Sequence, residues 1–206
     1  EKLVIIENGV GNGASLSVPG GLCSVKAPQI IFVGNLTLNK GIEVFFDAIK
    51  CLQDLGKALE IKVIGGGDIE SVKASLSARG LEKKVHLLGV IPHHLVLESL
   101  SNADIFVNAS YAEGRSNALL EAISAGIPAV ASDIPPNREL LGDGRFGYLF
   151  EAGNPEELAK VLSEVIDKPA EANQKANMAW QHLQSKGATW RKCALCYMQL
   201  FQKALA

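Results

Sequence analysis

The 206-residue sequence has no run of about 20 consecutive apolar residues, the length that a helix needs to cross a membrane. It has no charged-then-apolar leader at its start, so a signal peptide is not predicted. It also has no excess of basic residues, because the formal net charge is −2 and no polybasic run occurs. A nucleic-acid partner is therefore not expected. These absences favour a cytoplasmic protein without a membrane span in this chain.

Three catalytic signatures are absent as well: the GxSxG elbow, the phosphate-binding P-loop and the HExxH zinc motif. The four cysteines include a CxxC pair, Cys193 and Cys196, but a zinc site usually needs a second pair of ligands. Cys193 recurs at helical spacing with large apolar residues, namely Trp190, Tyr197, Leu200 and Phe201. We therefore predict structural cysteines and no metal site.

His93 and His94 are adjacent, which raises the question of a metal ligand or a general base. Neighbouring residues on a helix do not share a face, and no carboxylate partner is near in the sequence. The sequence favours surface or loop positions without a catalytic role for both.

Short apolar runs rich in β-branched residues alternate with longer stretches of helical period. This alternation predicts an α/β fold, a Rossmann-like doubly wound parallel sheet with helices on both faces. Strands are predicted at residues 30–34, 59–64, 85–89, 104–108, 128–132 and 147–150. A helix after the first strand would bury one apolar face, made of Ile42, Phe45, Phe46, Ile49 and Leu52.

Asn154 and Pro155 predict a helix start, because Asn caps helices and Pro suits the first helical position.

The segment 8–21 is rich in glycine, and its GVGNG is similar to half of a dinucleotide-binding fingerprint. The GxGxxG spacing fails and Pro19 follows, so a loop or linker is favoured over a cofactor turn.

Four loops with unusual residues follow predicted strands: 35–41, 65–68, 90–94 and 110–117. In open α/β sheets ligands bind outside the carboxyl ends of the strands, where such loops converge. We expect all four loops at one edge of the sheet.

The stretch EGRSNALLEA, residues 113–122, combines a helix start with two carboxylates. Ser116 or Asn117 would cap the helix and leave the amides of Asn117, Ala118 and Leu119 near its positive end, where a diphosphate binds without a side-chain cation. Glu121, about one turn into the helix, would accept hydrogen bonds from vicinal hydroxyls such as those of a ribose. Glu113 would accept them from a sugar beyond the phosphates.

Each of these interpretations has a plainer alternative. Glu113 would simply serve helix capping, and Glu121 would be a solvated side chain. Lys40, in the loop GNLTLNKG, would neutralise charge on a leaving nucleotide, or it would be a surface residue. The glycines of GGGD, residues 65–68, would let backbone approach a ligand, or Asp68 would merely cap the next helix.

Several motifs in this order are similar to those of a known family. They are VIIENGV, IIFVGNLTLNKGIEVFFDAI, LEIKVIGGGD, VHLLGVIPHHLVLESLSNADIFVNAS and EGRSNALLEAISAGIPAVASD, the last with two glutamates separated by seven residues. The chain resembles the retaining glycosyltransferases of group 1, family 4, which have two Rossmann-like domains (the GT-B fold). The resemblance covers the C-terminal, donor-binding domain only. It implies a single domain over 1–206, with a leading strand and linker at 1–25.

The resemblance implies a role for each candidate residue. Glu113 would contact the transferred sugar and Lys40 the diphosphate, as the catalytic pair, while Glu121 would bind the ribose. The backbone at Val90 and Ile91 would border the base. The other implied donor-binding residues are Gly34, Asn35, Gly66, Arg115, Ser116, Asn117, Ala118 and Leu119. The co-substrate would be a UDP- or GDP-linked sugar, with no metal and no other cofactor.

One position departs from the family pattern. The residue after Gly34 is commonly Arg, which partners the lysine, and here it is Asn35. The loss of a guanidinium weakens the expected phosphate clamp. Arg115 stands where an apolar residue is frequent, and we hypothesise that it contacts the diphosphate in compensation.

The resemblance also implies what lies beyond this chain. The acceptor, a glycan or a lipid-linked sugar, would be bound by an N-terminal domain, and the helix 189–206 would pack back on that domain. The isolated chain would then be inactive, and any peripheral attachment to the inner membrane face would belong to the other half. Two alternatives stay open: a binding module that recognises nucleotide sugars without turnover, and a sugar-nucleotide epimerase of similar shape.

Overall fold

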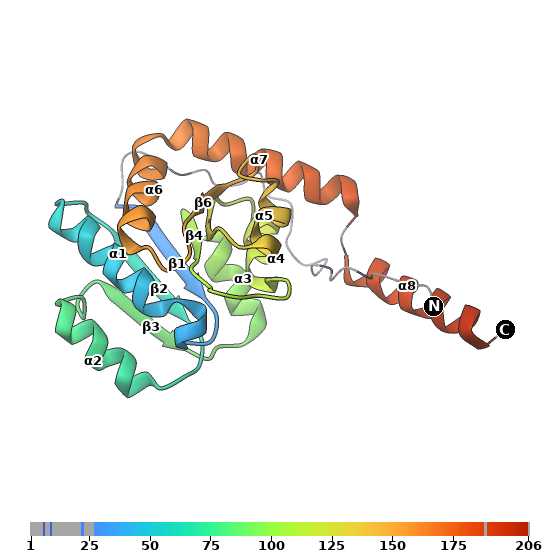
Figure 1. Cartoon of the computed structure of the whole chain (residues 1–206), viewed down its shortest axis with the longest axis horizontal. Helices are drawn as coiled ribbons and strands as arrows, with labels where there is room; N and C mark the ends of the chain where they lie inside the picture. The colour runs from blue at the N-terminus through green and yellow to red at the C-terminus, as the bar shows by residue number, and fades with distance from the viewer. Residues whose placement is uncertain (1–5, 7–8, 10–21, 23–26, 188, 206) are drawn as a thin grey trace.

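A computed structural model of the chain describes residues 6, 9, 22, 27–187 and 189–205. Its centre is a six-stranded, wholly parallel sheet (Figure 1). The strands are β1 (Gln29–Val33), β2 (Glu60–Ile64), β3 (Val85–Gly89), β4 (Ile105–Asn108), β5 (Ala129–Ser132) and β6 (Tyr148–Phe150). The predicted strands are therefore confirmed to within one residue at each end. The predicted leading strand and the glycine-rich loop 8–21 lie outside the described residues, apart from residues 6 and 9.

The helices alternate with the strands until the last three, which follow one another. They are α1 (Ile42–Asp54), α2 (Ile69–Arg79), α3 (His93–Ser101), α4 (Asn117–Ala125), α5 (Pro135–Leu141), α6 (Pro155–Asp167), α7 (Pro169–Lys186) and α8 (Trp190–Leu205), with a short 3-10 helix η1 (Leu38–Lys40) before α1.

The strand order is β3-β2-β1-β4-β5-β6, so the chain winds outward from β1 in one direction and from β4 in the other. Ile30 pairs with Ile61 of β2 on one side and with Ile105 of β4 on the other. This order confirms the doubly wound α/β fold that the alternating pattern predicts. It also creates a switch point between the carboxyl ends of β1 and β4.

Two hydrophobic clusters cover the two faces of the sheet, because successive strand residues point to opposite sides. On one face, Ile30 and Phe32 pack with Phe45 and Phe46 of α1 and with Leu162 of α6. On the other face, Ile31 and Phe106 pack with residues of α3, α4 and α7, among them Leu100, Leu120 and Leu183. Burial on both faces fixes the strand positions and, with them, the loops at the strand ends.

Three helix starts are fixed by side chains that accept a hydrogen bond from the first turn. Asn154 accepts from the amide of Glu157, Asp68 from that of Ser71, and Ser116 from that of Leu119. The predicted caps at Asn154 and Asp68 are confirmed. Of the two candidates for the cap of α4, Ser116 supplies it.

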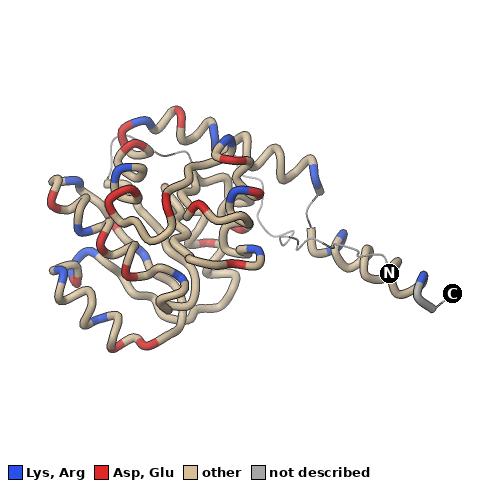
Figure 2. Tube along the Cα trace, viewed as in Figure 1, with Lys and Arg blue, Asp and Glu red and all other residues tan. Residues whose placement is uncertain are grey.

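The last helix, α8, extends away from the body of the molecule (Figure 1). Its large apolar side chains are about half exposed, namely Trp190, Leu195, Tyr197, Met198 and Phe201. Figure 2 shows acidic and basic residues interspersed over the body, whereas the charged residues of α8 are all basic. No helix in the described part of the chain is both long and apolar enough to span a membrane.

Candidate functional site

A cavity of about 280 Å³ lies at the switch point between β1 and β4. The end of β1 and the loop after it form one side, and the end of β4 with the start of α4 forms the other. The lining residues are Phe32, Val33, Gly34, Asn35, Lys40, Asn108, Ala109, Ser110, Glu113, Arg115, Ser116, Asn117 and Ala118. The cavity therefore brings together eight of the predicted site residues.

The turn at Gly41 places Lys40 at this cavity. Gly41 has a φ of 68°, and a Cβ on it would lie 2.0 Å from the carbonyl oxygen of Ala109. Only glycine allows the backbone before α1 to approach the end of β4 this closely. The amide of Tyr111 also donates to the carbonyl of Asn39 at 2.9 Å, which joins the two loops.

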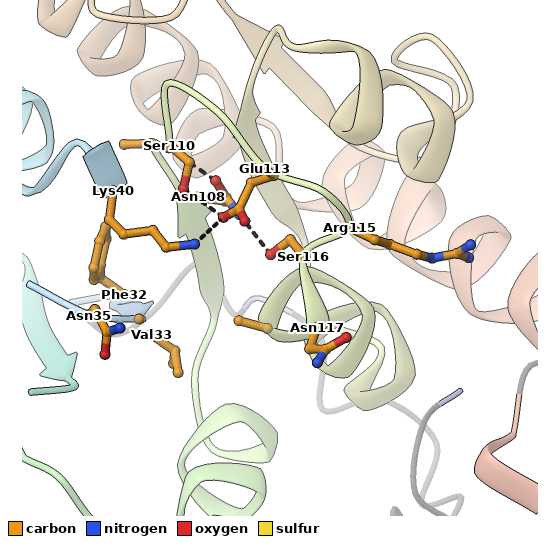
Figure 3. Close-up of a pocket in the computed structure, with 13 residues that line it drawn as sticks. Phe32, Val33, Asn35, Lys40, Asn108, Ser110, Glu113, Arg115, Ser116 and Asn117 are labelled. Atoms are coloured by element: carbon orange, nitrogen blue, oxygen red, sulfur yellow. Dashed lines mark hydrogen bonds and ion pairs between the residues drawn. The ribbon is translucent and has the colours of Figure 1, made fainter. Parts of the chain in front are cut away.

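Lys40 and Glu113 form an ion pair at the cavity, with Nζ of Lys40 at 2.6 Å from Oε1 of Glu113 (Figure 3). The same carboxylate oxygen accepts a hydrogen bond from Oγ of Ser110 at 2.8 Å. Glu113 is 11% exposed and Lys40 27%. Glu113 does not cap α4, since Ser116 does, and the capping alternative for Glu113 is wrong.

A buried hydrogen-bonded network supports this side of the cavity. Asn108 donates to Oγ of Ser116 at 2.9 Å and accepts from the amide of Ser110 at 3.1 Å. Ser132 donates through Oγ to the carbonyl of Ser110 at 2.5 Å, and Asn137 donates to the carbonyl of Ser132 at 3.0 Å. Because its members are almost fully buried, the network fixes the loop that carries Glu113.

Sequence reasoning did not single out Asn108, Ser110, Ser132 and Asn137 as supports of the site. A usable signal was present, since Asn108 and Ser132 end strands that are otherwise apolar. A polar residue at the carboxyl end of a buried strand must find a partner there.

Glycines join the loops after β1, β2 and β3. A Cβ on Gly65 would lie 1.8 Å from the carbonyl oxygen of Gly34, so the two backbones are in direct contact. The amide of Leu36 donates to the carbonyl of Gly66 at 2.7 Å, and a Cβ on Gly66 would lie 3.0 Å from Cγ2 of Val90. With the contacts of Lys40 and Tyr111, these approaches confirm that the predicted loops meet at one edge.

Glu121 lies on α4 outside the cavity lining, and its partner is His93. Nε2 of His93 is 2.8 Å from Oε1 of Glu121. The Glu121 side chain is 18% exposed, so the alternative of a freely solvated carboxylate is wrong. His93 is 64% exposed, as predicted, but its contact with Glu121, 28 residues away, was not predicted from the sequence.

Four further candidate residues lie at or next to the start of α4. The amide of Leu119 is engaged by Oγ of Ser116 at 3.3 Å, whereas Asn117 and Ala118 line the cavity. Arg115 also borders the cavity, yet its side chain points away from Lys40 and Glu113 (Figure 3). Its contact with a diphosphate stays a prediction.

Two cationic residues, Lys40 and Arg115, line the cavity together with one carboxylate, Glu113, and the start of α4. Lys40 and the positive end of α4 favour an anion, and the Glu113 carboxylate, which already accepts from the Ser110 hydroxyl, is a hydrogen-bond acceptor. No three His, Cys, Asp or Glu side chains of the described residues form a group that could hold a metal ion.

The fold and the cavity together define an α/β protein with a cavity at the switch point of a doubly wound parallel sheet. Residues 22–181 match the family model described as glycosyl transferases group 1. The chain belongs to this family.

Curated relatives agree with that assignment. The chain is 33% identical over 141 residues to the amylovoran biosynthesis glycosyltransferase AmsK of Erwinia amylovora, a match that covers 65% of this chain and 35% of the relative. It is 31% identical over 167 residues to a phosphatidyl-myo-inositol mannosyltransferase of Mycobacterium leprae, covering 79% and 44%. The chain thus spans less than half the length of these two relatives.

Solved structures share the fold at low identity. HepE of Anabaena, solved with UDP and glucose, has a TM-score of 0.78 at 19% identity, covering 87% of this chain and 49% of HepE. The sucrose-phosphate synthase of Thermosynechococcus elongatus has a TM-score of 0.85 at 21% identity, covering 97% and 52%. These are GT-B glycosyltransferases, and the fold of this chain corresponds to about half of each.

Proposed function

We propose that this chain is the donor-binding domain of a retaining, family 4 glycosyltransferase that moves a sugar from a nucleotide sugar to an acceptor hydroxyl. The observation that carries the proposal is the Lys40–Glu113 pair, 2.6 Å apart at the switch-point cavity beside the start of α4. A nucleotide sugar presents anionic phosphates next to neutral hydroxyls. The Lys40 ammonium would bind the phosphates and the Glu113 carboxylate would bind the hydroxyls, so the pair matches these two parts of the donor.

The diphosphate would lie between Lys40 and the amides at the start of α4. Backbone donors and the helix dipole favour an anion there, and Lys40 adds a point charge. When the bond from the anomeric carbon to the phosphate oxygen breaks, the nucleoside diphosphate leaves with the bonding electrons. The acceptor oxygen forms the new bond to the anomeric carbon, and its proton passes to an oxygen of the departing diphosphate. Lys40 and α4 stabilise the negative charge that develops on the leaving group.

The two ends of the donor would have separate partners. Glu113, held by Lys40 and Ser110, would accept hydrogen bonds from the transferred sugar. Glu121, one turn along α4, would accept them from the ribose. The backbone at Val90 and Ile91 would border the base, and Val90 lies against Gly66 of the glycine loop after β2. No metal takes part in the proposed chemistry.

The acceptor would be bound by a second domain of a longer, cytoplasmic protein. The chain spans 35% and 44% of the two curated relatives described above. The half-exposed aromatic residues of α8 support a further packing surface. We expect no sugar transfer from the 206-residue chain alone. A polysaccharide or glycolipid product is proposed from the biosynthetic relatives.

Thermal unfolding of this chain with UDP, GDP and ADP tests the donor site. A bound nucleotide at 100 times its dissociation constant stabilises the fold by roughly 2.7 kcal/mol. We expect a shift with one of the three, and we expect Glu121→Ala to weaken it. Glu98→Ala, a change at an exposed residue of α3, is the matched control.

The absence of a shift with all three nucleotides would overturn the proposed donor site. An equal shift in the wild type and in Glu121→Ala would remove only the ribose assignment. Turnover of the donor sugar without an acceptor would favour an epimerase instead.

A further inference from the structure

The contact between His93 and Glu121 is not explained by the donor contacts proposed above. Nε2 of His93 lies 2.8 Å from Oε1 of Glu121. An ionised carboxylate only accepts hydrogen bonds, so Nε2 carries the proton and donates it. The ring therefore holds one oxygen of a carboxylate that is itself largely shielded from solvent.

Packing between two helices fixes this contact in space. His93 is the first residue of α3, and Glu121 lies in the middle of α4. The two helices pack through a shared buried cluster that includes Val96 and Leu100 from α3 and Leu119 from α4. Because packing already fixes the two helix backbones, the pair has only the two side chains to order.

The helix face that carries Glu121 continues the cavity. Asn117 lines the cavity, and Glu121 follows it four residues later on the same face of α4. The two positions are about one turn, or roughly 5.4 Å, apart along the axis. A carboxylate has about four lone-pair positions, so the bond from His93 leaves room for two hydroxyl donors.

We propose that His93 is a positioning residue that orients Glu121 to accept hydrogen bonds from the two ribose hydroxyls of the donor. The inference rests on the proposed function, because it needs a nucleotide at the cavity. Without the imidazole, the Glu121 carboxylate samples more rotamers and must be ordered when the ribose binds. His93 then acts on ribose recognition through Glu121 and not on the phosphates or the base.

Nucleotides with and without the hydroxyl pair test the proposal. UDP, GDP and ADP are each titrated calorimetrically into the 206-residue chain, together with the corresponding 2′,3′-dideoxynucleoside diphosphates. We expect His93→Ala to weaken the ribose form about fivefold and to leave the dideoxy form unchanged. His93→Gln, which keeps an N–H donor, should restore most of the difference. His94→Ala, at the adjacent exposed residue, should change neither.

The outcomes separate this inference from the proposed function. If His93→Ala weakens both forms equally, or neither, the positioning role is wrong even though the donor site stands. If the wild type binds none of the diphosphates, the donor site is wrong and the role of His93 falls with it. Loss of the ribose preference in His93→Ala, with its recovery in His93→Gln, is a result that general destabilisation of α3 would not produce.

Discussion

The ammonium of Lys40 lies 2.6 Å from the carboxylate of Glu113, although 73 residues separate them in the sequence. Each group satisfies the other in the absence of a donor. Under the proposed function, a nucleoside diphosphate would therefore compete with Glu113 for Lys40, and it would also bring negative charge close to a carboxylate. A sugar hydroxyl, in contrast, would donate to Glu113. The pair would thus favour an intact donor over the spent nucleotide.

Glu113→Gln should for this reason bind the free nucleoside diphosphate more tightly than the wild type, by about threefold to tenfold. The change removes the charge that competes for Lys40. Calorimetric titration with the diphosphate that stabilises the wild type measures the gain. Ser110→Ala, which removes a hydrogen bond to Glu113 but keeps the charge, should show none. Weaker binding by Glu113→Gln would contradict the competition.

Asn35→Arg should strengthen binding of the nucleoside diphosphate about fivefold, because it adds a cation to the cavity beside Lys40. The gain should shrink as salt is added, since screening weakens exposed charges. Affinity measured at low and at high ionic strength checks both statements. Thr37→Arg places the same charge on the same loop but outside the cavity lining, and an equal gain there would rule out a specific contact.

Gly41→Ala should destabilise the fold by about 2–4 kcal/mol, because it combines an unfavourable positive φ with a clash against the carbonyl of Ala109. Urea unfolding measures the loss. Gly56 also has a positive φ of 74°, but a Cβ there meets nothing within 4 Å. Gly56→Ala should cost only about 1–2 kcal/mol. Similar losses in the two variants would show that the close approach at Gly41 is unimportant.

Ser132→Ala should cost about 1–3 kcal/mol, since it removes the hydroxyl that donates to Ser110 and leaves buried polar groups with fewer partners. The same change at Ser101, an exposed residue at the end of α3, should stay within about 0.5 kcal/mol. Chemical unfolding of both variants gives the comparison. Equal effects would mean that the buried network contributes little to stability.

The pKa of His182 predicts that the fold loses stability in acid. Burial, followed by the nearby charges of Lys186 and Arg145, lowers the pKa of His182 below its usual 6.5, and the ring stacks on Phe146 at 4.6 Å. As pH falls through 6.5, the unfolded state therefore binds a proton at His182 at a higher pH than the folded state does. The stability that the neutral ring contributes is complete above that pH and declines below it.

His182→Gln should consequently lose less stability than the wild type between pH 8 and pH 5.5, values chosen to bracket the usual histidine pKa of about 6.5. Melting temperatures at the two pH values provide the measurement. His86→Gln, at an exposed residue of β3, controls for the removal of a histidine. The same acid loss in His182→Gln as in the wild type would refute the assignment.

Local features of the sequence predicted most of the fold. The strands were correct to within one residue, because β-branched runs bounded by glycine and polar residues form strands wherever a core covers both faces. The caps at Asp68 and Asn154 were correct, because a cap depends on residues only three positions apart. The convergence of the four loops at one edge followed from the parallel sheet that these strands predict.

The sequence by itself determined the strands, the helix starts and the residue types available at the carboxyl edge of the sheet. Only the tertiary structure decided which of them meet: Lys40 with Glu113, His93 with Glu121, and Ser132 with Ser110. These contacts span 22 to 73 residues. They depend on the strand order and on the packing of α3 against α4, which arise from burial of the whole core and not from any local pattern.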